Sequence, residues 1–202
     1  FGGIGNDQPI SPSDPFYARD IPQRPYDPDR ARFHLKQAGL TNLEVSLSAS
    51  DSPYVGCVDA CTLFREYAAP AGITVNVVRE PQDGYYANVW MKRPFLASYW
   101  VGRPTADMIL TTVYSSGSSF NETGWKNERF DTLLNEARSM LDHDGRAQRY
   151  AELQRMLHDT GATIIPAFSS YVGAHSNKLA HGAIGGNAEA DDFKIAERWW
   201  FA

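Results

Sequence analysis

The 202-residue sequence predicts an α/β fold, in which a wound sheet is covered by helices. Strand-length stretches rich in apolar and aromatic residues occur at 43–49, 73–79 and 95–101. The intervals between them have the length and the apolar periodicity of helices. A strand–helix–strand–helix–strand order is typical of a sheet with right-handed crossovers.

The first 25 residues are rich in Gly, Pro, Ser and Asp and show no periodicity, so we expect an extended surface segment. A helix should follow, because Asp27 is a good N-cap and Pro28 suits a first helical turn. Gly39 should end this helix. Its expected buried contacts are Phe33, Leu35 and Ala38.

The middle of the chain continues the alternation. We predict a helix at 54–69, a short helix capped by Asp83, and a strand at 95–101. Pro104 fits the first turn of a further helix, where its missing N–H costs little.

Two longer helices are predicted at 127–141 and 145–160, capped by Asn127 and Asp144, and Gly161 should end the second. Both should pack on the sheet through Phe130, Leu134, Tyr150 and Leu157. The apolar stripe of the first helix comprises Phe130, Leu133, Leu134, Ala137 and Leu141.

The amino-acid composition of the chain changes near residue 170. Residues 163–168 again have a strand pattern, whereas small residues and loops dominate beyond 170 until a strand-like stretch at 194–201. We therefore predict an α/β ligand-binding lobe at 26–170. The segment 171–202 is too short to fold alone, so it should complete a sheet or pack on a neighbouring part.

Composition excludes two classes of partner. The net charge of −5 and the absence of a Lys/Arg stripe argue against nucleic acid and against an anionic membrane surface. No apolar run approaches the ~18–20 residues that a transmembrane helix needs. The chain begins Phe1-Gly2-Gly3, which we interpret as the product of signal removal or the start of a piece of a longer protein.

The two cysteines, Cys57 and Cys61, are four residues apart in a predicted helix. This spacing puts them on one face with Cα atoms roughly 6 Å apart and with poor Cβ geometry for a disulfide. A tetrahedral metal site would need two more ligands. We predict two reduced, buried core residues.

Signals for catalysis are weak. The sequence has no G-x-S-x-G elbow, no phosphate-binding glycine loop and no H-E-x-x-H pair. The five histidines are scattered, and Asp142 and Asp144 have the position of helix caps. We therefore predict no enzyme activity, no catalytic or metal-ligating residue and no cofactor.

The stretch from Tyr99 to Pro104 is the best candidate for ligand binding. It places Trp100 and Arg103 where a predicted strand ends, and ligands of open α/β sheets bind at the carboxyl ends of strands. An indole beside a guanidinium suits a small ligand that carries an anionic group. The alternative is an interface tryptophan with an ordinary surface arginine.

Several ordered motifs resemble one protein family. They include Y-D-P-D-R-A at 26–31, A-G-I-T-V at 71–75, and a string that runs from Asn121 through Trp125 and Asn127 to Ile165-Pro166. Together these motifs cover nearly the whole chain. They resemble the C-terminal half of the periplasmic solute-binding proteins of ABC importers for dipeptides, oligopeptides and nickel.

The resemblance implies one lobe of a two-lobed flytrap fold, with a central mixed sheet flanked by helices. It implies a periplasmic protein that binds a small-molecule or peptide ligand and delivers it to ABC permease transmembrane subunits. Family members are far longer than 202 residues, so an N-terminal lobe of the same protein should be missing here. Residues 171–202 should then return toward that lobe.

One departure from the family bears on the ligand. In peptide-binding members an aspartate follows the cleft tryptophan by three residues and holds the peptide ammonium group, but here that position is Arg103. The ligand should therefore be a small anionic or zwitterionic solute. Asp107 could partly restore a negative site, or it could pair with Arg103. The candidate ligand-binding residues are Trp100, Gly102, Arg103, Asp107 and Asn121.

Two other classes of function stay open at this point. One is a hydrolase or transferase domain whose catalytic residues the sequence disguises, and it requires a nucleophile and a base within hydrogen-bond reach. The other is a protein-interaction module, which requires an exposed apolar patch larger than a few hundred Å².

Overall fold

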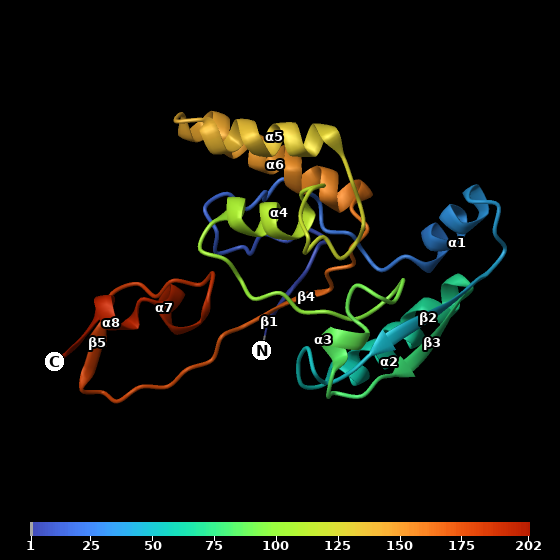
Figure 1. Ribbon diagram of the computed structural model, residues 1–202, viewed down its shortest axis with the longest axis horizontal. Coiled ribbons are helices and arrows are strands. Elements are labelled where there is room, and N and C mark those ends of the chain that lie inside the picture. The colour runs from blue at the N-terminus through green and yellow to red at the C-terminus, as the bar shows by residue number, and fades with distance from the viewer. Residues whose placement is uncertain (1) are drawn as a thin grey trace. The chain divides into compact units, whose positions relative to one another are not determined.

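The computed structural model describes residues 2–202 and divides the chain into two compact units (Figure 1). One unit is Pro25–Trp100, and the other joins residues up to Arg24 with Val101–Ala202. Among residues 2–202, none of the helices combines the length and apolar composition that crossing a bilayer demands.

The unit Pro25–Trp100 is built around two parallel strands. Its strands are β2 (Leu43–Ala49) and β3 (Ile73–Arg79), paired in the register Leu43↔Ile73. Its helices are α1 (Pro28–Gln37), α2 (Cys57–Ala68), the 3-10 turn η1 (Ala69–Ala71) and α3 (Tyr85–Asn88). Figure 1 shows α2 lying along the strand pair. The two strand predictions at 43–49 and 73–79 are confirmed.

The core of this unit lies between α2 and the strands. It contains Leu47, Ala49, Cys57, Cys61, Ala68 and Val75. Both cysteines are reduced and buried, one helical turn apart, as predicted. Small and aliphatic side chains fill this layer.

The predicted strand at 95–101 is wrong, apart from a single parallel bridge between Ser48 and Leu96. The Ser48 N–H donates to the Phe95 carbonyl (3.1 Å) and the Ala97 N–H donates to the Ser48 carbonyl (2.9 Å). The Tyr85 hydroxyl then donates to the Ala97 carbonyl (2.7 Å). Because a side chain takes this acceptor, the ladder ends there and the chain leaves the sheet.

Helix α1 begins as predicted, with the Asp27 carboxylate accepting from the Arg30 N–H (2.8 Å) and Pro28 in the first turn. Gly39 follows with φ of +76°, the left-handed conformation that glycine adopts readily. Leu35 is buried, but Phe33 is 55% exposed, so its predicted burial is wrong. Two residues separate side chains by about 200° around a helix, so Phe33 and Leu35 cannot face the same core. Ala38 is also exposed.

The second unit contains two antiparallel strand pairs and most of the helices. β1 (Gly2–Ile4) pairs with β4 (Ala167–Ser169), and β5 (Leu179–His181) pairs with β6 (Trp199–Phe201). The helices are α4 (Ala106–Tyr114), α5 (Glu128–Ser139), α6 (His143–Thr160), α7 (Glu189–Phe193) and α8 (Ile195–Arg198). The α/β class is thus confirmed, although the described strands form three separate pairs in place of one central sheet.

Helices α5 and α6 lie side by side (Figure 1), and the four side chains predicted to be buried on them are buried. The prediction that these helices pack on a sheet is wrong, because they pack chiefly on each other, and α5 also contacts α4. Phe130, Leu134, Tyr150 and Leu157 are each at most 3% exposed. Burying such side chains contributes ~1.5–3 kcal/mol each. Leu141 is 94% exposed because α5 ends at Ser139, two residues before it.

The segment before Arg24 is extended over much of its length but is not confined to the surface. Gln8, Ile10 and Ala18 are buried. The buried Gln154 side chain of α6 donates to the Phe16 carbonyl (2.7 Å) and accepts from the Ala18 N–H (3.0 Å). These two bonds fix the segment against the helix pair.

The helix caps follow the sequence with three shifts. Asn127 caps α5 and Gly161 ends α6, as predicted. The cap of α6 is Asp142 in place of Asp144, and Gly84 in place of Asp83 precedes α3. Pro104 lies outside α4, whose N-cap is Thr105.

The strand expected at 194–201 is reduced to β6, because α8 occupies 195–198. The strand expected at 163–168 is likewise shorter and shifted, and only Ala167 and Phe168 of it lie in β4.

Replacing Asn127 by alanine should destabilise the protein by about 1 kcal/mol, because the Asn127 Oδ1 accepts the Phe130 N–H (3.1 Å) at the start of α5. Urea denaturation followed by circular dichroism measures this loss. Lys126→Ala, one residue earlier and exposed, is the control. Equal losses in both variants would show that the cap bond contributes nothing.

Candidate functional site

The predicted ligand-binding residues fall on both sides of the boundary between the two units. Trp100 is the last residue of the unit Pro25–Trp100, and Gly102, Arg103, Asp107 and Asn121 belong to the other unit. The surroundings of these residues are described within each unit in turn.

Trp100 extends a chain of aromatic rings in its own unit. The ring centroids of Tyr86 and Trp90 are 6.2 Å apart, and those of Trp90 and Trp100 are 6.4 Å apart, both with edge contacts. Such edge-to-face pairs are favourable and hold the rings in fixed orientations. Both tryptophans are partly exposed, so the chain of rings offers an apolar wall.

The contact of Trp90 with Trp100 was not predicted from the sequence. α3 ends at Asn88, and the turn after it carries Trp90 toward Trp100.

Polar groups lie at the carboxyl ends of β2 and β3, where the parallel sheet predicts a ligand site. Asp51 follows β2 and forms an ion pair with Arg79 (3.7 Å). Glu80 follows β3, accepts from the Ser48 hydroxyl (3.0 Å) and pairs with Arg93 (3.6 Å). These contacts compensate the charge of both carboxylates within the unit.

The hydroxyl of Tyr85 stabilises the same end of the sheet. Its one O–H donates to the Ala97 carbonyl (2.7 Å), with the Ser48 carbonyl also within reach (3.3 Å), and burial raises the pKa of its phenol. A tyrosine in this position acts as a structural donor, because deprotonation would remove its only hydrogen.

In the other unit, Gly102 is packed directly against the C-terminal segment. A Cβ at this position would lie 1.6 Å from the carbonyl oxygen of Asn187, and the Gly102 N–H donates to the Tyr171 hydroxyl (3.4 Å). No side chain larger than hydrogen fits without displacing Asn187. Tyr171 and Asn187 were not predicted as neighbours of this site, because their separation in sequence gives no local pattern.

Arg103 is partly buried, and its Nη1 donates to the Val101 carbonyl (3.2 Å). This bond uses one of the five N–H donors of the guanidinium. The bond turns the Arg103 guanidinium back toward Val101, where the chain enters this unit.

Asp107 does not pair with Arg103, contrary to the alternative raised from their spacing. Its carboxylate forms an ion pair with Arg138 of α5 (3.1 Å). Arg138 also donates to the Thr111 hydroxyl (2.7 Å), so the three side chains tie α4 to α5. Asp107 borders a pocket of about 230 Å³, which is also lined by Phe16, Thr105, Ala106, Ala137, Arg138, Arg146 and Tyr150.

Asn121 organises the loop between α4 and α5. Its Nδ2 donates to the carbonyls of Ser115 (3.3 Å) and Trp125 (2.7 Å), and its Oδ1 accepts from the Thr123 hydroxyl (2.9 Å). The side chain is buried, and the loop's own backbone takes its two N–H donors. Within this unit, therefore, Gly102 and Arg103 are adjacent, whereas Asp107 and Asn121 have structural partners of their own.

Asn121→Ala should therefore cost about 1–3 kcal/mol of stability, because it leaves two partly buried loop carbonyls without their donor. Chemical denaturation of the variant measures this cost, with the exposed Asn177→Ala as the matched control. A loss no larger than that of the control would contradict the structural role.

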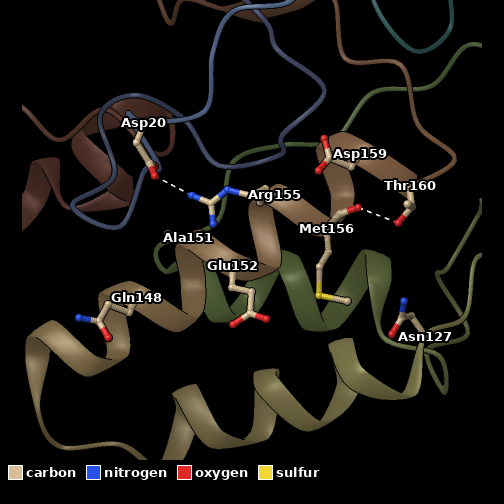
Figure 2. A pocket seen from close by; sticks show the side chains of 9 residues that line it. All are labelled: Asp20, Asn127, Gln148, Ala151, Glu152, Arg155, Met156, Asp159 and Thr160. Atoms are coloured by element: carbon tan, nitrogen blue, oxygen red, sulfur yellow. Dashed lines mark hydrogen bonds and ion pairs between the residues drawn. The ribbon is translucent and has the colours of Figure 1, made fainter.

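A hollow larger than the one beside Asp107 lies elsewhere in the described part of the chain. It has a volume of about 700 Å³ and is lined mainly by α6, with Asp20 and Asn127 at its rim (Figure 2). Figure 2 shows Arg155 reaching toward Asp20, with which it forms an ion pair of 2.6 Å. The other residues that line this hollow are Gln148, Ala151, Glu152, Met156, Asp159 and Thr160. None of them was predicted as a ligand-binding residue.

Metal ligands do not gather in the part of the chain that the structure describes: residues 2–202 contain no group of three or more His, Cys, Asp or Glu side chains that could hold an ion. Trp90 and Trp100 present aromatic surfaces in the unit Pro25–Trp100, and Arg103 carries a cation in the other unit.

No family model matches the sequence. The chain is 24% identical over 184 residues to the dipeptide-binding protein of Escherichia coli K12. The alignment covers 83% of this chain and 33% of that protein. It is 28% identical over 158 residues to di/tripeptide-binding protein 2 of Pseudomonas aeruginosa UCBPP-PA14, which covers 71% of this chain and 28% of that protein. The chain thus spans about a third of the length of these curated relatives.

Solved structures show the same fold. The periplasmic binding protein DppA of Helicobacter pylori, in complex with the peptide STSA, superposes with a TM-score of 0.75 over 100% of this chain and 39% of DppA, at 18% identity. NikZ of Campylobacter jejuni, in complex with Ni(L-His), gives a TM-score of 0.77 over 98% of this chain and 43% of NikZ, at 18% identity. The chain is thus similar in sequence to part of the curated dipeptide- and tripeptide-binding proteins, and it shares the fold of a portion of DppA and of NikZ.

Proposed function

We propose that this chain is the ligand-binding lobe of the solute receptor of an ABC importer. It binds a small peptide-like, anionic or zwitterionic solute, together with the remaining lobe of the same protein, and delivers it to the permease subunits in the membrane. The receptor acts in the periplasm and performs no chemistry on its ligand.

The observation that carries this proposal is the agreement between the two kinds of relative. The curated relatives are named for binding dipeptides and tripeptides, and DppA, which shares the fold over the whole chain, is described with a bound peptide. A chain that covers about a third of such a protein corresponds to a lobe, since a receptor of this class closes two lobes around its ligand.

The aromatic wall supports a ligand with apolar parts. Trp90 and Trp100 are partly exposed and hold each other by an edge contact. Ligand pockets are lined mainly by apolar and aromatic side chains, with a few polar groups that fix orientation. We propose that this wall contacts the side chains of the solute.

Arg103 supplies the polar group. Its guanidinium is always charged and offers a planar set of donors that matches a carboxylate. We propose that Arg103 binds the carboxylate of the ligand and that Gly102 positions Arg103 by packing closely against Asn187. Asp107 and Asn121 then position α4 and the following loop without contacting the ligand.

A panel of matched peptides tests the proposal on the whole receptor that contains this chain. Dialanine, N-acetyl-dialanine and dialanine amide differ only in which terminal charge they carry, and titration calorimetry measures their dissociation constants. We expect N-acetyl-dialanine to retain binding and the amide to lose it, because Arg103 needs a carboxylate. Equal binding of the amide would contradict the role of Arg103, and failure of all peptides would contradict a peptide-like ligand.

A further inference from the structure

The pocket beside Asp107 lies within one unit of the chain, and α4, α5 and α6 all contribute to its wall. Its volume is about 230 Å³. A cavity of about 150 Å³ already accommodates benzene, so this pocket has room for a small organic molecule. Trp100 and Arg103 are not among the residues that line it. The pocket is therefore a candidate for a ligand other than the one proposed above.

The charged side chains that line this pocket do not cancel. Asp107 and Arg138 form an ion pair (3.1 Å), so these two charges compensate each other. Arg146 is partly buried, donates from Nε to the Met140 carbonyl (2.9 Å) and forms no ion pair with a carboxylate of residues 2–202. Its guanidinium has further N–H groups to offer. The lining thus carries one positive charge in excess.

The hydroxyl of Tyr150 is a second donor in the wall of this pocket. Tyr150 is only 3% exposed, and within residues 2–202 its O–H makes no hydrogen bond. Burial raises the pKa of the phenol, so the hydroxyl keeps its proton at neutral pH. Buried polar groups normally have a hydrogen-bond partner, and this donor therefore indicates an acceptor inside the pocket.

Much of the remaining wall is apolar. Ala106 and Ala137 supply methyl groups, and Phe16 supplies a ring whose centroid lies 5.0 Å from that of Tyr150. A cation and a hydroxyl donor beside apolar surface are complementary to a carboxylate on an apolar body. Phosphate or sulfate fits less well, because the apolar part of the wall would leave several of their oxygens without donors.

We propose that this pocket binds a small monocarboxylate with an apolar body. The Arg146 guanidinium and the Tyr150 hydroxyl donate to the carboxylate, and Phe16 contacts the apolar part. The Asp107–Arg138 pair fixes the wall between α4 and α5. This site is separate from the one proposed at Trp100 and Arg103, and it does not depend on the receptor function.

Titration calorimetry with benzoate tests the site on the whole receptor that contains this chain. Benzamide, which has the same shape without the charge, is the matched ligand. We expect benzoate to bind and benzamide to bind at least about 10-fold more weakly, because a charge-assisted hydrogen bond is lost. Equal binding of the two compounds, or no binding of benzoate, would overturn the proposal. Benzoate binding that Arg103→Ala abolishes would place the anion at Arg103 and overturn it as well.

Two substitutions test the roles of the donors. Tyr150→Phe removes only the hydroxyl and should weaken benzoate binding about 10- to 100-fold. It should leave the free energy of unfolding of the ligand-free protein unchanged, because the hydroxyl loses no partner there. Arg146→Gln removes the charge and should weaken benzoate binding at least as much. A stability loss in Tyr150→Phe with unchanged benzoate affinity would show that the hydroxyl is only structural, and would refute the site.

Arg149→Gln is the matched control on the same helix. Arg149 forms an ion pair with Glu136 (3.2 Å) and is not among the residues that line the pocket. The substitution removes one positive charge from α6, as Arg146→Gln does, and it should leave benzoate binding unchanged. Equal losses in the two variants would mean that benzoate responds to the net charge of the helix, which would contradict a specific site.

Discussion

Replacing Phe130 by alanine is expected to destabilise the α5–α6 pair by about 3–5 kcal/mol, the largest loss for any single change described above. Phe130 is 0% exposed, and its ring contacts Trp125 at a centroid distance of 5.2 Å, edge to face. Alanine removes these contacts and leaves a cavity that the rigid helix pair cannot close. Urea denaturation followed by tryptophan fluorescence and circular dichroism measures the loss.

Leu141→Ala provides the matched control for this experiment. The sequence placed Leu141 on the same apolar stripe, but in the structure its side chain is 94% exposed. Exposed substitutions usually change stability by within ±0.5 kcal/mol, so Leu141→Ala should have almost no effect. A similar loss in both variants would show that the stripe packs differently from the structure.

Replacing Arg103 should give the largest effect on binding. A charge-assisted hydrogen bond to a carboxylate contributes ~1.5–3 kcal/mol, so Arg103→Ala in the whole receptor should weaken binding of a carboxylate ligand about 10- to 100-fold. Arg103→Asp should weaken it further, because repulsion replaces attraction in a partly desolvated site. Titration calorimetry with the tightest-binding peptide of the dialanine panel measures both.

The control for Arg103 is another arginine of the same unit. Arg155 forms an ion pair with Asp20 on the surface of α6, and exposed pairs contribute only ~0–1 kcal/mol. Arg155→Ala should leave the dissociation constant unchanged. Unchanged affinity in both Arg103 variants would mean that this arginine does not bind the ligand. The inference that the ligand is anionic would then be wrong.

Local sequence signals predicted the helices well because caps and periodicity act within one or two turns. Asp27 and Asn127 accept backbone N–H groups at the starts of α1 and α5, as their positions indicated. The buried faces of α5 and α6 followed directly from apolar spacing. The errors at Phe33 and Leu141 arose where an apolar residue fitted a helix pattern but lay on the outer face or beyond the helix end.

Pairing between distant segments could not be predicted in the same way. The aromatic run at 95–101 has the composition of a strand, but only Leu96 forms a bridge, because the Tyr85 hydroxyl takes the Ala97 carbonyl. The partner of Asp107 is Arg138, which lies 31 residues away, so the local spacing to Arg103 was misleading. The contact of Gly102 with Asn187 likewise depends on the tertiary fold.

For the candidate site, the sequence located the stretch around Trp100 and Arg103 but not its surroundings. Trp90 contacts Trp100 within one unit, and Tyr171 contacts Gly102 within the other. No short-range sequence pattern indicates either contact. The binding roles of Trp100, Gly102 and Arg103 stay predictions until a ligand is measured.

Native mass spectrometry of the whole receptor, purified from its own cells without added ligand, tests the central claim most directly. The chain is proposed to be the ligand-binding lobe of a receptor that closes on a solute, so a fraction of the protein should carry one small molecule. We predict a single additional mass per chain, released on denaturation and identified as a carboxylate-bearing, peptide-like compound. A receptor that carries no small molecule and gains none when incubated with peptides would contradict the proposed function.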